Sequence, residues 1–326
     1  MRTKRNVLSV GEILVDFVST KSGKTLKDAQ SFLKCAGGAP ANVAVGIARL
    51  GTRSAFIGKV GDDPFGRFLV SEMHSAGVDT SGIQFDAGHK TRLAFVSLKE
   101  DGDRDFEFWE HRPADEYLLP SDVRVDLLKR ADIVNIGSFL LLRNPPLATV
   151  MRVAQSARKL GKDVCYDPNL RLSLWKDHHE ARRVMTTMMR KATIVRLNDV
   201  EVAFLTRSHD LETAAERIRG LGPRLVVVTS DSKGCYFQTE KFAGFVPGFE
   251  VKAVDTTGCG DGFLAGLLHG LAQEKKNLEE YTASELCTIC TVANAVGALV
   301  ATRRGGIAAM PSRKDVSRFL QRVDKK

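Results

Sequence analysis

The 326-residue sequence has no apolar run long enough to span a lipid bilayer. Its longest apolar stretches, such as Phe139–Leu142 and Val292–Ala301, fall far short of the roughly 20 residues that a spanning helix needs. The sequence also has no low-complexity segment and no Pro/Ser-rich linker. We therefore exclude a disordered, collagen-like or repeat protein, and we expect neither a membrane span nor a second independent domain.

We expect no secretion signal. Met1–Arg5 is basic and precedes the apolar stretch Val7–Val15, but Glu12 interrupts that stretch and no small-residue cleavage site follows. We interpret Val7–Val15 as a first strand, and we expect a cytoplasmic protein whose six cysteines are reduced. Cys287 and Cys290 have the spacing of metal ligands but no second pair or histidine nearby, which favours structural thiols.

Basic runs interleaved with stacking aromatics, the pattern of nucleic-acid binding, do not occur. The formal net charge is +9, but the two ends, Met1–Arg5 and Arg322–Lys326, carry more than half of it. The rest of the chain mixes both signs. We therefore expect no nucleic-acid partner.

Short β-branched runs alternate with amphipathic segments along most of the chain. We predict strands over Val7–Val15, Ser54–Val60, Ile133–Ile136, Val164–Asp167, Ile194–Asn198 and Leu225–Thr229. We predict helices over Ala41–Leu50, Pro64–Ala76, Pro146–Leu160, Asp177–Arg190, Leu211–Leu221 and Ala283–Ala301. The alternation predicts right-handed crossovers in an α/β fold, with a doubly wound, mostly parallel sheet and helices on both faces.

Two segments depart from this alternation. Thr91–Trp109 is typical of a β-hairpin with its turn at Asp101 and Gly102. Asp16–Lys34 lacks helical spacing and is a candidate to pair with that hairpin. We expect a single domain, residues 1–326, with a small β-sheet lid built from about 16–36 and 90–115 over a substrate cleft.

The most informative segment is Asp255–Phe263, which reads DTTGCGDGF and leads into an apolar helical stretch. Glycines and a small residue directly before a helix leave backbone N–H groups accessible at the positive end of the helix dipole, where anions bind. A carboxylate beside such a site is suited to take a proton from a hydroxyl nucleophile. We therefore interpret Asp261 as a general base rather than as a helix cap. The anion hole would consist of the amides of Gly258, Cys259 and Gly260.

A second glycine-rich segment, Gly37–Ala44, leads into another predicted helix. Gly37 and Gly38 permit close approach of a polar ligand, and Asn42 on the first helical turn can both donate and accept hydrogen bonds. Taken alone, a Gly-Gly pair before Pro40 is equally typical of an ordinary turn.

The two segments, in their order and separation, resemble the PfkB (ribokinase-like) family of sugar kinases, closest in motifs to fructokinases. The resemblance covers nearly the whole chain, and Asp255–Phe263 is its most specific part. It implies a ribokinase-like fold with a β-sheet lid, ATP as phosphoryl donor, Mg²⁺ as bridging ion and a sugar hydroxyl as acceptor. It also implies a homodimer through the lid. The family's base falls here on Asp261.

Further roles follow from this resemblance. Asn198 and Glu201 look like the family's Asn-x-x-Glu element, which helps hold magnesium and phosphate through water, although the same spacing also fits a capped helix start. The positions that resemble ATP contacts are Asn198, Thr229, Gly234 and Asn294. A monovalent cation site, of the potassium type, is implied at Asp255, Thr257, Ala301 and Gly305.

The sugar would lie just past the first strand. The positions that resemble sugar ligands are Asp16, Gly37, Gly38, Asn42, Arg104, Phe106, Asp167 and Arg171. Asp167–Arg171 is similar to both fructokinases and 2-keto-3-deoxygluconate kinases. Glu110 stands where relatives often carry Arg, and a glutamate facing the pocket disfavours an anionic sugar acid, unless Arg112 compensates for its charge. We expect ATP-dependent phosphorylation of fructose to fructose 6-phosphate. The alternatives are a 2-keto-3-deoxygluconate kinase and a non-catalytic sensing protein on the same fold.

Overall fold

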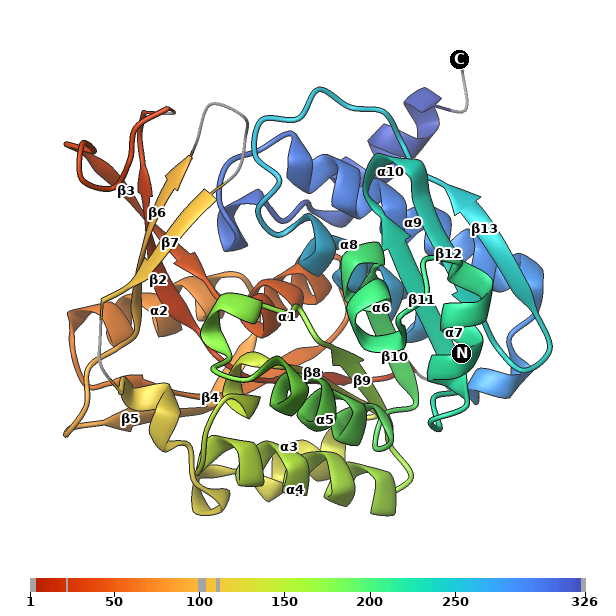
Figure 1. Cartoon of the computed structure of the whole chain (residues 1–326), viewed down its shortest axis with the longest axis horizontal. Coiled ribbons are helices and arrows are strands. Elements are labelled where there is room, and N and C mark those ends of the chain that lie inside the picture. The colour runs from red at the N-terminus through yellow and green to blue at the C-terminus, as the bar shows by residue number, and fades with distance from the viewer. Residues whose placement is uncertain (1–3, 22, 99–103, 110–111, 324–326) are drawn as a thin grey trace.

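Seven parallel strands form the centre of the computed structural model. The structure describes residues 4–21, 23–98, 104–109 and 112–323, and for residues 98 and 104–106 it describes the backbone alone. Two antiparallel strands extend this sheet at one edge, giving the order β13-β12-β11-β10-β9-β8-β1-β4-β5 (Figure 1). The nine strands are β1 (Val7–Val10), β4 (Ser54–Gly61), β5 (Asp79–Asp86), β8 (Ile133–Gly137), β9 (Asp163–Asp167), β10 (Ile194–Asn198), β11 (Leu225–Ser230), β12 (Gly234–Gln238) and β13 (Ala243–Pro247).

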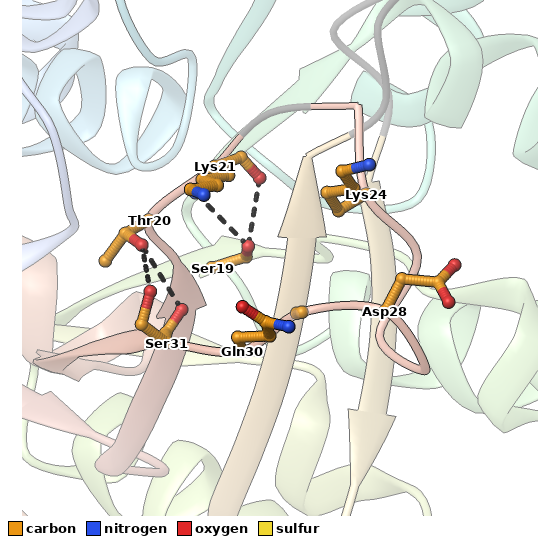
Figure 2. Close-up of a pocket in the computed structure, with 8 residues that line it drawn as sticks. Ser19, Thr20, Lys21, Lys24, Asp28, Gln30 and Ser31 are labelled. Atoms are coloured by element: carbon orange, nitrogen blue, oxygen red, sulfur yellow. Dashed lines mark hydrogen bonds between the residues drawn. The ribbon is translucent and has the colours of Figure 1, made fainter.

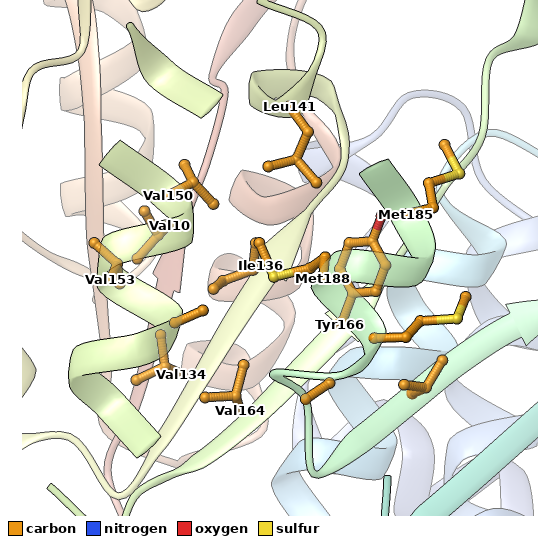
Figure 3. Close-up of a cluster of buried hydrophobic side chains, with 14 of the residues drawn as sticks. Val10, Val134, Ile136, Leu141, Val150, Val153, Val164, Tyr166, Met185 and Met188 are labelled. Carbon is orange, nitrogen blue, oxygen red and sulfur yellow. The ribbon is translucent and has the colours of Figure 1, made fainter. Parts of the chain in front are cut away.

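Helices cover both faces of the sheet because its strands carry apolar side chains on both sides. On β9, Val164 and Tyr166 point into one core (Figure 3), whereas Cys165 points into the other. The first core is covered by α3 (Val125–Arg130), α4 (Pro146–Lys159), α5 (His178–Met189), α6 (Asp199–Thr206) and α7 (Leu211–Arg219). The second is covered by α1 (Ala39–Arg49), α8 (Cys259–Leu271) and α9 (Ala283–Ala301). α2 (Pro64–Ser75) packs against β5, and α10 (Arg313–Val323) packs against α9. The predicted doubly wound α/β fold is confirmed.

A separate four-stranded sheet stands beside the main one, in the order β3-β2-β6-β7 (Figure 1). Its strands are β2 (Leu14–Ser19), β3 (Phe32–Gly37), β6 (Leu93–Leu98) and β7 (Arg104–Phe108). Phe17 of β2 stacks on Phe95 of β6 with ring centroids 5.2 Å apart. The predicted hairpin and its pairing with the N-terminal segment are therefore confirmed, while the predicted turn at Asp101 and Gly102 lies outside the described residues.

The prediction of one continuous strand over Val7–Val15 was wrong. β1 ends at Val10, and β2 begins at Leu14 in the other sheet. Pro40, at the start of α1, packs against Gly11 and occupies the space that a Cβ atom at position 11 would need. The break carries the chain from the main sheet into the lid and leaves Glu12 between the two sheets.

α9 is long and apolar enough to cross a membrane by length and composition alone. It packs against α8 and also contacts β12 and β13, as a core helix does. Its buried side chains include Ala293 and Cys290, and the Cys290 thiol lies against Cys235 of β12. These contacts account for the buried apolar side chains of α9.

Candidate active site

The two glycine-rich segments meet at the carboxyl ends of the central strands. Gly38 caps α1 and Gly258 caps α8. α1 begins beside the ends of β1 and β8, where Pro40 meets Gly11 and Gly137, and α8 begins against Arg196 of β10. Ligands bind at this edge in doubly wound folds, because several strand ends and helix N-termini converge there. The structure thus brings the two segments together although they are more than 200 residues apart.

Asp261 lies in the first turn of α8 with its carboxylate buried in this cleft. Its Oδ2 accepts a hydrogen bond from Asn42 Nδ2 at 2.8 Å. Burial raises the pKa of Asp261 to about 6, and the Asp167 carboxylate also raises it, whereas Asn42 and the Arg196 and Arg171 guanidinium groups lower it. A carboxylate with a pKa near neutrality suits proton abstraction at physiological pH.

The turn before Asp261 is built for close approach. Gly258 adopts a left-handed conformation, with φ of 77°, and its carbonyl accepts the Gly262 N–H at 2.7 Å. The Cys259 N–H donates to the Thr256 carbonyl at 3.3 Å, a long bond that a stronger anionic acceptor would replace. One of the three amides of the predicted anion hole is therefore held by the turn itself, and the anion hole stays a prediction.

Arg196 of β10 lies beside this turn, and its place in the site was not predicted from the sequence. It lies under Gly260, where an added Cβ would meet both terminal guanidinium nitrogens at 2.8 Å. Nη1 lies 3.4 Å from Asp167 Oδ2, and Nη2 donates to Thr229 Oγ1 at 2.6 Å. In the sequence, Arg196 is a single charged residue inside an otherwise apolar strand, and this pattern does not indicate that Asp167 and Thr229 are its partners.

The predicted sugar ligands Asp16, Gly37 and Gly38 line the lid side of the cleft. Asp16 of β2 leans over Gly37 of β3, where an added Cβ would fall 2.1 Å from Asp16 Oδ2. Only a glycine at position 37 therefore leaves the Asp16 carboxylate in its place. Arg104 and Phe106 lie on β7, but their side chains, like the whole of Glu110, lie outside the described residues.

Glu12 is a second residue that the sequence did not single out as part of the site. It is 5% exposed, and its Oε1 accepts the Ala39 N–H at the start of α1 at 3.0 Å. Burial is the main cause that raises the pKa of Glu12 to about 8; the Asp115 and Asp261 carboxylates add to it, and the hydrogen bond from the Ala39 N–H opposes it. Glu12 is therefore a neutral acid at pH 7 that fixes the glycine-rich turn of α1.

The remaining sugar-side residues surround Asp261. Asp167 ends β9 and is buried, and burial raises its pKa. Arg171 is exposed, and its Nη1 donates to the Leu170 carbonyl at 3.2 Å. Its guanidinium is near enough to lower the pKa of both Asp167 and Asp261, so it borders the same cleft.

Asn198 and Glu201 form a capping box at the start of α6. Asn198 Oδ1 accepts the Glu201 N–H, and Glu201 Oε2 accepts the Asn198 N–H, each at 2.8 Å. Glu201 Oε1 accepts the Leu170 N–H at 2.6 Å, which ties the helix to the segment after β9. The capped helix start is thus present, and burial together with Asp167 raises the pKa of Glu201.

Two predicted nucleotide contacts also fix the edge of the sheet. Asn294 of α9 donates through Nδ2 to the Val246 and Pro247 carbonyls of β13, at 3.2 and 3.0 Å. Gly234 begins β12 and lies against the Val246 carbonyl. Both residues therefore have structural roles beside the end of β11, where Thr229 lies.

The four residues of the predicted cation site come together. Asp255 Oδ1 accepts hydrogen bonds from the Thr257 N–H and Oγ1, and Asp255 Oδ2 accepts the Gly305 N–H at 3.0 Å. The Ala301 carbonyl accepts the Asp255 N–H at 3.2 Å. These hydrogen bonds join the loop before α8 to the end of α9 and the segment that follows it.

A polar hollow of about 240 Å³ lies apart from these residues (Figure 2). It is lined by Ser19, Thr20, Lys21, Lys24, Asp28, Ala29, Gln30 and Ser31, at the tip of the β2–β3 hairpin. None of the predicted site residues lines it. Thr20 and Ser31 bridge its two sides through a hydrogen bond between their hydroxyls, so it is a feature of the hairpin itself.

Comparisons with known proteins agree with this arrangement. A family model described as pfkB family carbohydrate kinase matches residues 4–313. Fructokinase-2 of Solanum lycopersicum is 40% identical over 316 residues, which are 97% of this chain and 96% of that protein. The crystal structure of a fructokinase with bound ATP from Xylella fastidiosa, 31% identical, matches 98% of this chain and 99% of its own with a TM-score of 0.89. A fructokinase double mutant from Vibrio cholerae O395, in fructose, ADP and potassium ion bound form, is 33% identical and matches 98% and 99% with a TM-score of 0.87. The chain belongs to the pfkB family of carbohydrate kinases.

Proposed function

We propose that this chain is a cytoplasmic kinase that transfers the terminal phosphoryl group of ATP to fructose, giving fructose 6-phosphate and ADP. The observation that carries the proposal is the contact of Asp261 with Asn42 beside the glycine turn of α8. It joins a base, a hydroxyl-binding amide and an anion site in one cleft. Full-length similarity to fructokinases, with structures that hold ATP or fructose and ADP, supports the same substrates.

The chemistry requires little beyond positioning and charge. Asp261 takes the proton of the sugar hydroxyl, whose oxygen forms a bond to the γ-phosphorus as the bond to the ADP oxygen breaks. The amides at the start of α8 and the Arg196 charge below them stabilise the negative charge on the phosphoryl oxygens. The lid strands β2, β3, β6 and β7 cover the sugar side of the cleft and exclude water.

The residues at Asn198 and Glu201 fit a magnesium ion held through water. Both Glu201 carboxylate oxygens already accept backbone N–H groups, so its direct coordination is disfavoured. The nearby Asp167 carboxylate raises the pKa of Glu201, and a divalent cation would relieve that repulsion. When held there through water by Asn198 and Glu201, magnesium would neutralise negative charge on the phosphates.

The loop around Asp255 gathers the oxygens that would hold a monovalent cation, and binding would require Asp255 and the Ala301 carbonyl to share or release the backbone N–H groups that they now accept. Its donor set would consist of the Asp255 carboxylate, the Thr257 hydroxyl and the carbonyls near Ala301 and Gly305, all of them oxygens. The Vibrio cholerae relative in potassium ion bound form supports potassium as the ion. Since Asp255 begins the DTTGCGD segment, a cation here would order the turn that leads to Asp261.

Carboxylates outnumber cations on the sugar side. Asp16, Asp167 and Asp261 lie near the glycine turns, where Glu12 is neutral, and Arg171 and Arg196 are the guanidinium groups that act on Asp261. This balance favours a neutral ketohexose over an anionic sugar acid.

The lid also exposes Leu33 and Trp109, which are 53% and 69% exposed, and we propose that a second copy of the chain covers them.

The test is a coupled ADP-release assay with ATP and magnesium, in which fructose, ribose and 2-keto-3-deoxygluconate are compared. We expect turnover on fructose with the highest kcat/KM. Preference for 2-keto-3-deoxygluconate would instead support the alternative kinase and assign a carboxylate-binding role to Arg171 or Arg112. Nucleotide binding without turnover on any sugar would support a sensing protein.

Replacing Gly37 by Ala should weaken fructose binding selectively. The new methyl group would displace the Asp16 carboxylate, because it falls 2.1 Å from Oδ2. We expect the KM for fructose to rise about tenfold or more, the equivalent of one charged hydrogen bond, with the KM for ATP unchanged. The control is Gly88→Ala, whose methyl group lies 3.5 Å from its nearest neighbour outside the lid. Equal fructose KM values in the two variants would remove Asp16 from the sugar site.

The Cys259 thiol should be labelled by maleimides in an ATP-sensitive manner. It is partly exposed at the start of α8, whereas Cys35, Cys165, Cys235 and Cys290 are buried. A helix N-terminus favours the reactive thiolate. We expect ATP with magnesium to protect Cys259, measured by mass spectrometry, while the labelling of Cys287, the other partly exposed thiol, stays the same. Equal labelling of Cys259 with and without ATP would place the phosphates elsewhere.

A further inference from the structure

Arg196 is a buried arginine that belongs to neither glycine-rich motif. It lies two residues before the end of β10 and is 7% exposed. Its Nη2 donates to Thr229 Oγ1 on β11, and its Nη1 pairs with Asp167 at the end of β9. One guanidinium therefore joins three neighbouring strands at the edge where the cleft lies.

The same guanidinium also supports the turn before α8. A Cβ on Gly260 would meet its two terminal nitrogens at 2.8 Å, so the side chain lies directly against the backbone of the turn. Its Nε is buried without a hydrogen-bond partner among the described residues. Arg196 is thus packed against the turn, with its hydrogen bonds directed to the two flanking strands.

Comparison with Arg5 shows that structural pairing alone does not explain Arg196. Arg5 is also buried, and it makes a short ion pair with Asp163 at the opposite, amino end of β9. Arg196 makes a longer pair, with Nη1 3.4 Å and 3.5 Å from the two Asp167 oxygens. Burial lowers the pKa of Arg196, but the Asp167, Glu201 and Asp261 carboxylates raise it above its usual value. The charge of Arg196 is therefore shared among the carboxylates of the cleft, whereas Arg5 has one close partner.

We infer that Arg196 is a positioning residue that couples the two halves of the cleft, with Asp167 on the sugar side and Thr229 on the nucleotide side held against the Gly260 turn. The inference rests on the proposed function, with Asp167 as the expected sugar ligand and Thr229 as the expected ATP contact. When either substrate fixes its side, the shared guanidinium orders the other side. Each substrate then favours binding of the other, and linkage makes this effect reciprocal.

The planar fork of arginine is essential to this arrangement. Its terminal nitrogens point to Asp167 and Thr229 in fixed directions, whereas a lysine ammonium is a point charge without that geometry. Arg196→Lys therefore keeps the charge and loses the simultaneous contacts. Arg196→Met loses both.

The test measures fructose binding by calorimetry, with and without a non-hydrolysable ATP analogue and magnesium. In the wild-type protein we expect the analogue to tighten fructose binding by at least about fivefold, within the usual range of coupling. Arg196→Lys should lose this factor while each ligand alone binds within a few-fold of wild type. Arg196→Met should lose the factor as well and should also bind the ATP analogue more weakly, because it lacks the charge beside the Gly260 turn. The matched control is Arg5→Lys, a buried arginine remote from the cleft, which should keep the full factor.

The pH dependence of kcat separates the charge of Arg196 from its geometry. The groups that face Asp261 are Asn42 from α1, Glu12 after β1, Asp167 and Arg171 from the end of β9, and Arg196 from β10. Arg196→Met should move the acid limb of kcat to higher pH, whereas Arg196→Lys should leave it in place. Loss of stability alone would not move this limb.

The outcomes distinguish this inference from the proposed function. Unchanged coupling in both Arg196 variants, or equal loss in Arg5→Lys, would overturn the positioning role. If Arg196→Met does not fold, Arg196→Lys carries the binding test by itself. Wild-type protein that binds both ligands with coupling but phosphorylates none of the sugars would overturn the proposed function and support this inference.

Discussion

Replacing Asp261 by Asn is expected to lower kcat on fructose about a thousandfold. The amide keeps the size of the side chain and can still accept the Asn42 Nδ2–H, so the geometry of the cleft is retained. It cannot take a proton from the sugar hydroxyl, and general-base catalysis is worth roughly a hundredfold to ten-thousandfold. The coupled ADP-release assay gives kcat, and calorimetry should show that fructose and the ATP analogue bind within a few-fold of wild type.

The control for this experiment is an aspartate at the start of another helix. Asp315 lies in the first turn of α10, and its Oδ2 accepts the Ser312 N–H at 3.0 Å, as a capping residue does. Asp315→Asn should lower stability by about 1 kcal/mol and leave kcat unchanged. A kcat of Asp261→Asn within tenfold of wild type would reduce Asp261 to a cap of the same kind.

The wild-type pH profile gives an independent check on this base. Asp261 must be ionised to accept a proton, and its pKa is raised to about 6. Turnover should therefore fall as the pH is lowered through about 6, rather than near 4 as for an exposed aspartate. A flat kcat between pH 5 and 8 would contradict the assignment.

The parts of the site that could be predicted from the sequence are those in which local backbone chemistry determines the role. A Gly-x-Gly turn before a helix exposes amides wherever it occurs, so Asp261 and Asn42 could be named without knowing that they touch across 219 positions. The alternation of apolar strands and helices likewise predicted β10 and α9 with their observed bounds. Local pattern was sufficient in both cases.

Arg196 and Glu12 could not be predicted because their roles depend on distant partners. Arg196 reads as one charge within an apolar strand, and its contacts with Asp167 and Thr229 span 29 and 33 positions. Glu12 reads as an interruption of a strand, and its partner is Ala39, which lies 27 positions away. Burial turns each of these charged residues into part of the cleft, and no periodicity in the sequence encodes that burial.

Replacing Glu12 by Gln should remove a large pH dependence of stability. The pKa of Glu12 is about 8 in the folded chain and about 4.5 when unfolded. Between these values the unfolded chain has lost the proton and the folded chain has kept it, so the free energy of unfolding falls as the pH rises, by up to about 1.4 kcal/mol per pH unit. The stabilisation from neutral Glu12 is therefore complete below pH 4.5 and is lost as the pH rises to 8.

Glutamine is a matched replacement, because its carbonyl oxygen can accept the Ala39 N–H in place of Oε1 and it carries no titratable proton. Urea unfolding of both proteins at several pH values between 5 and 9 should give a difference that grows with pH in favour of Glu12→Gln. Asp261 also titrates in this range but is common to both proteins, so its contribution largely cancels. Parallel stability curves would mean that Glu12 is ionised in the folded cleft. The turn of α1 would then carry a negative charge beside Asp261, and this charge would raise the pKa of Asp261 above 6.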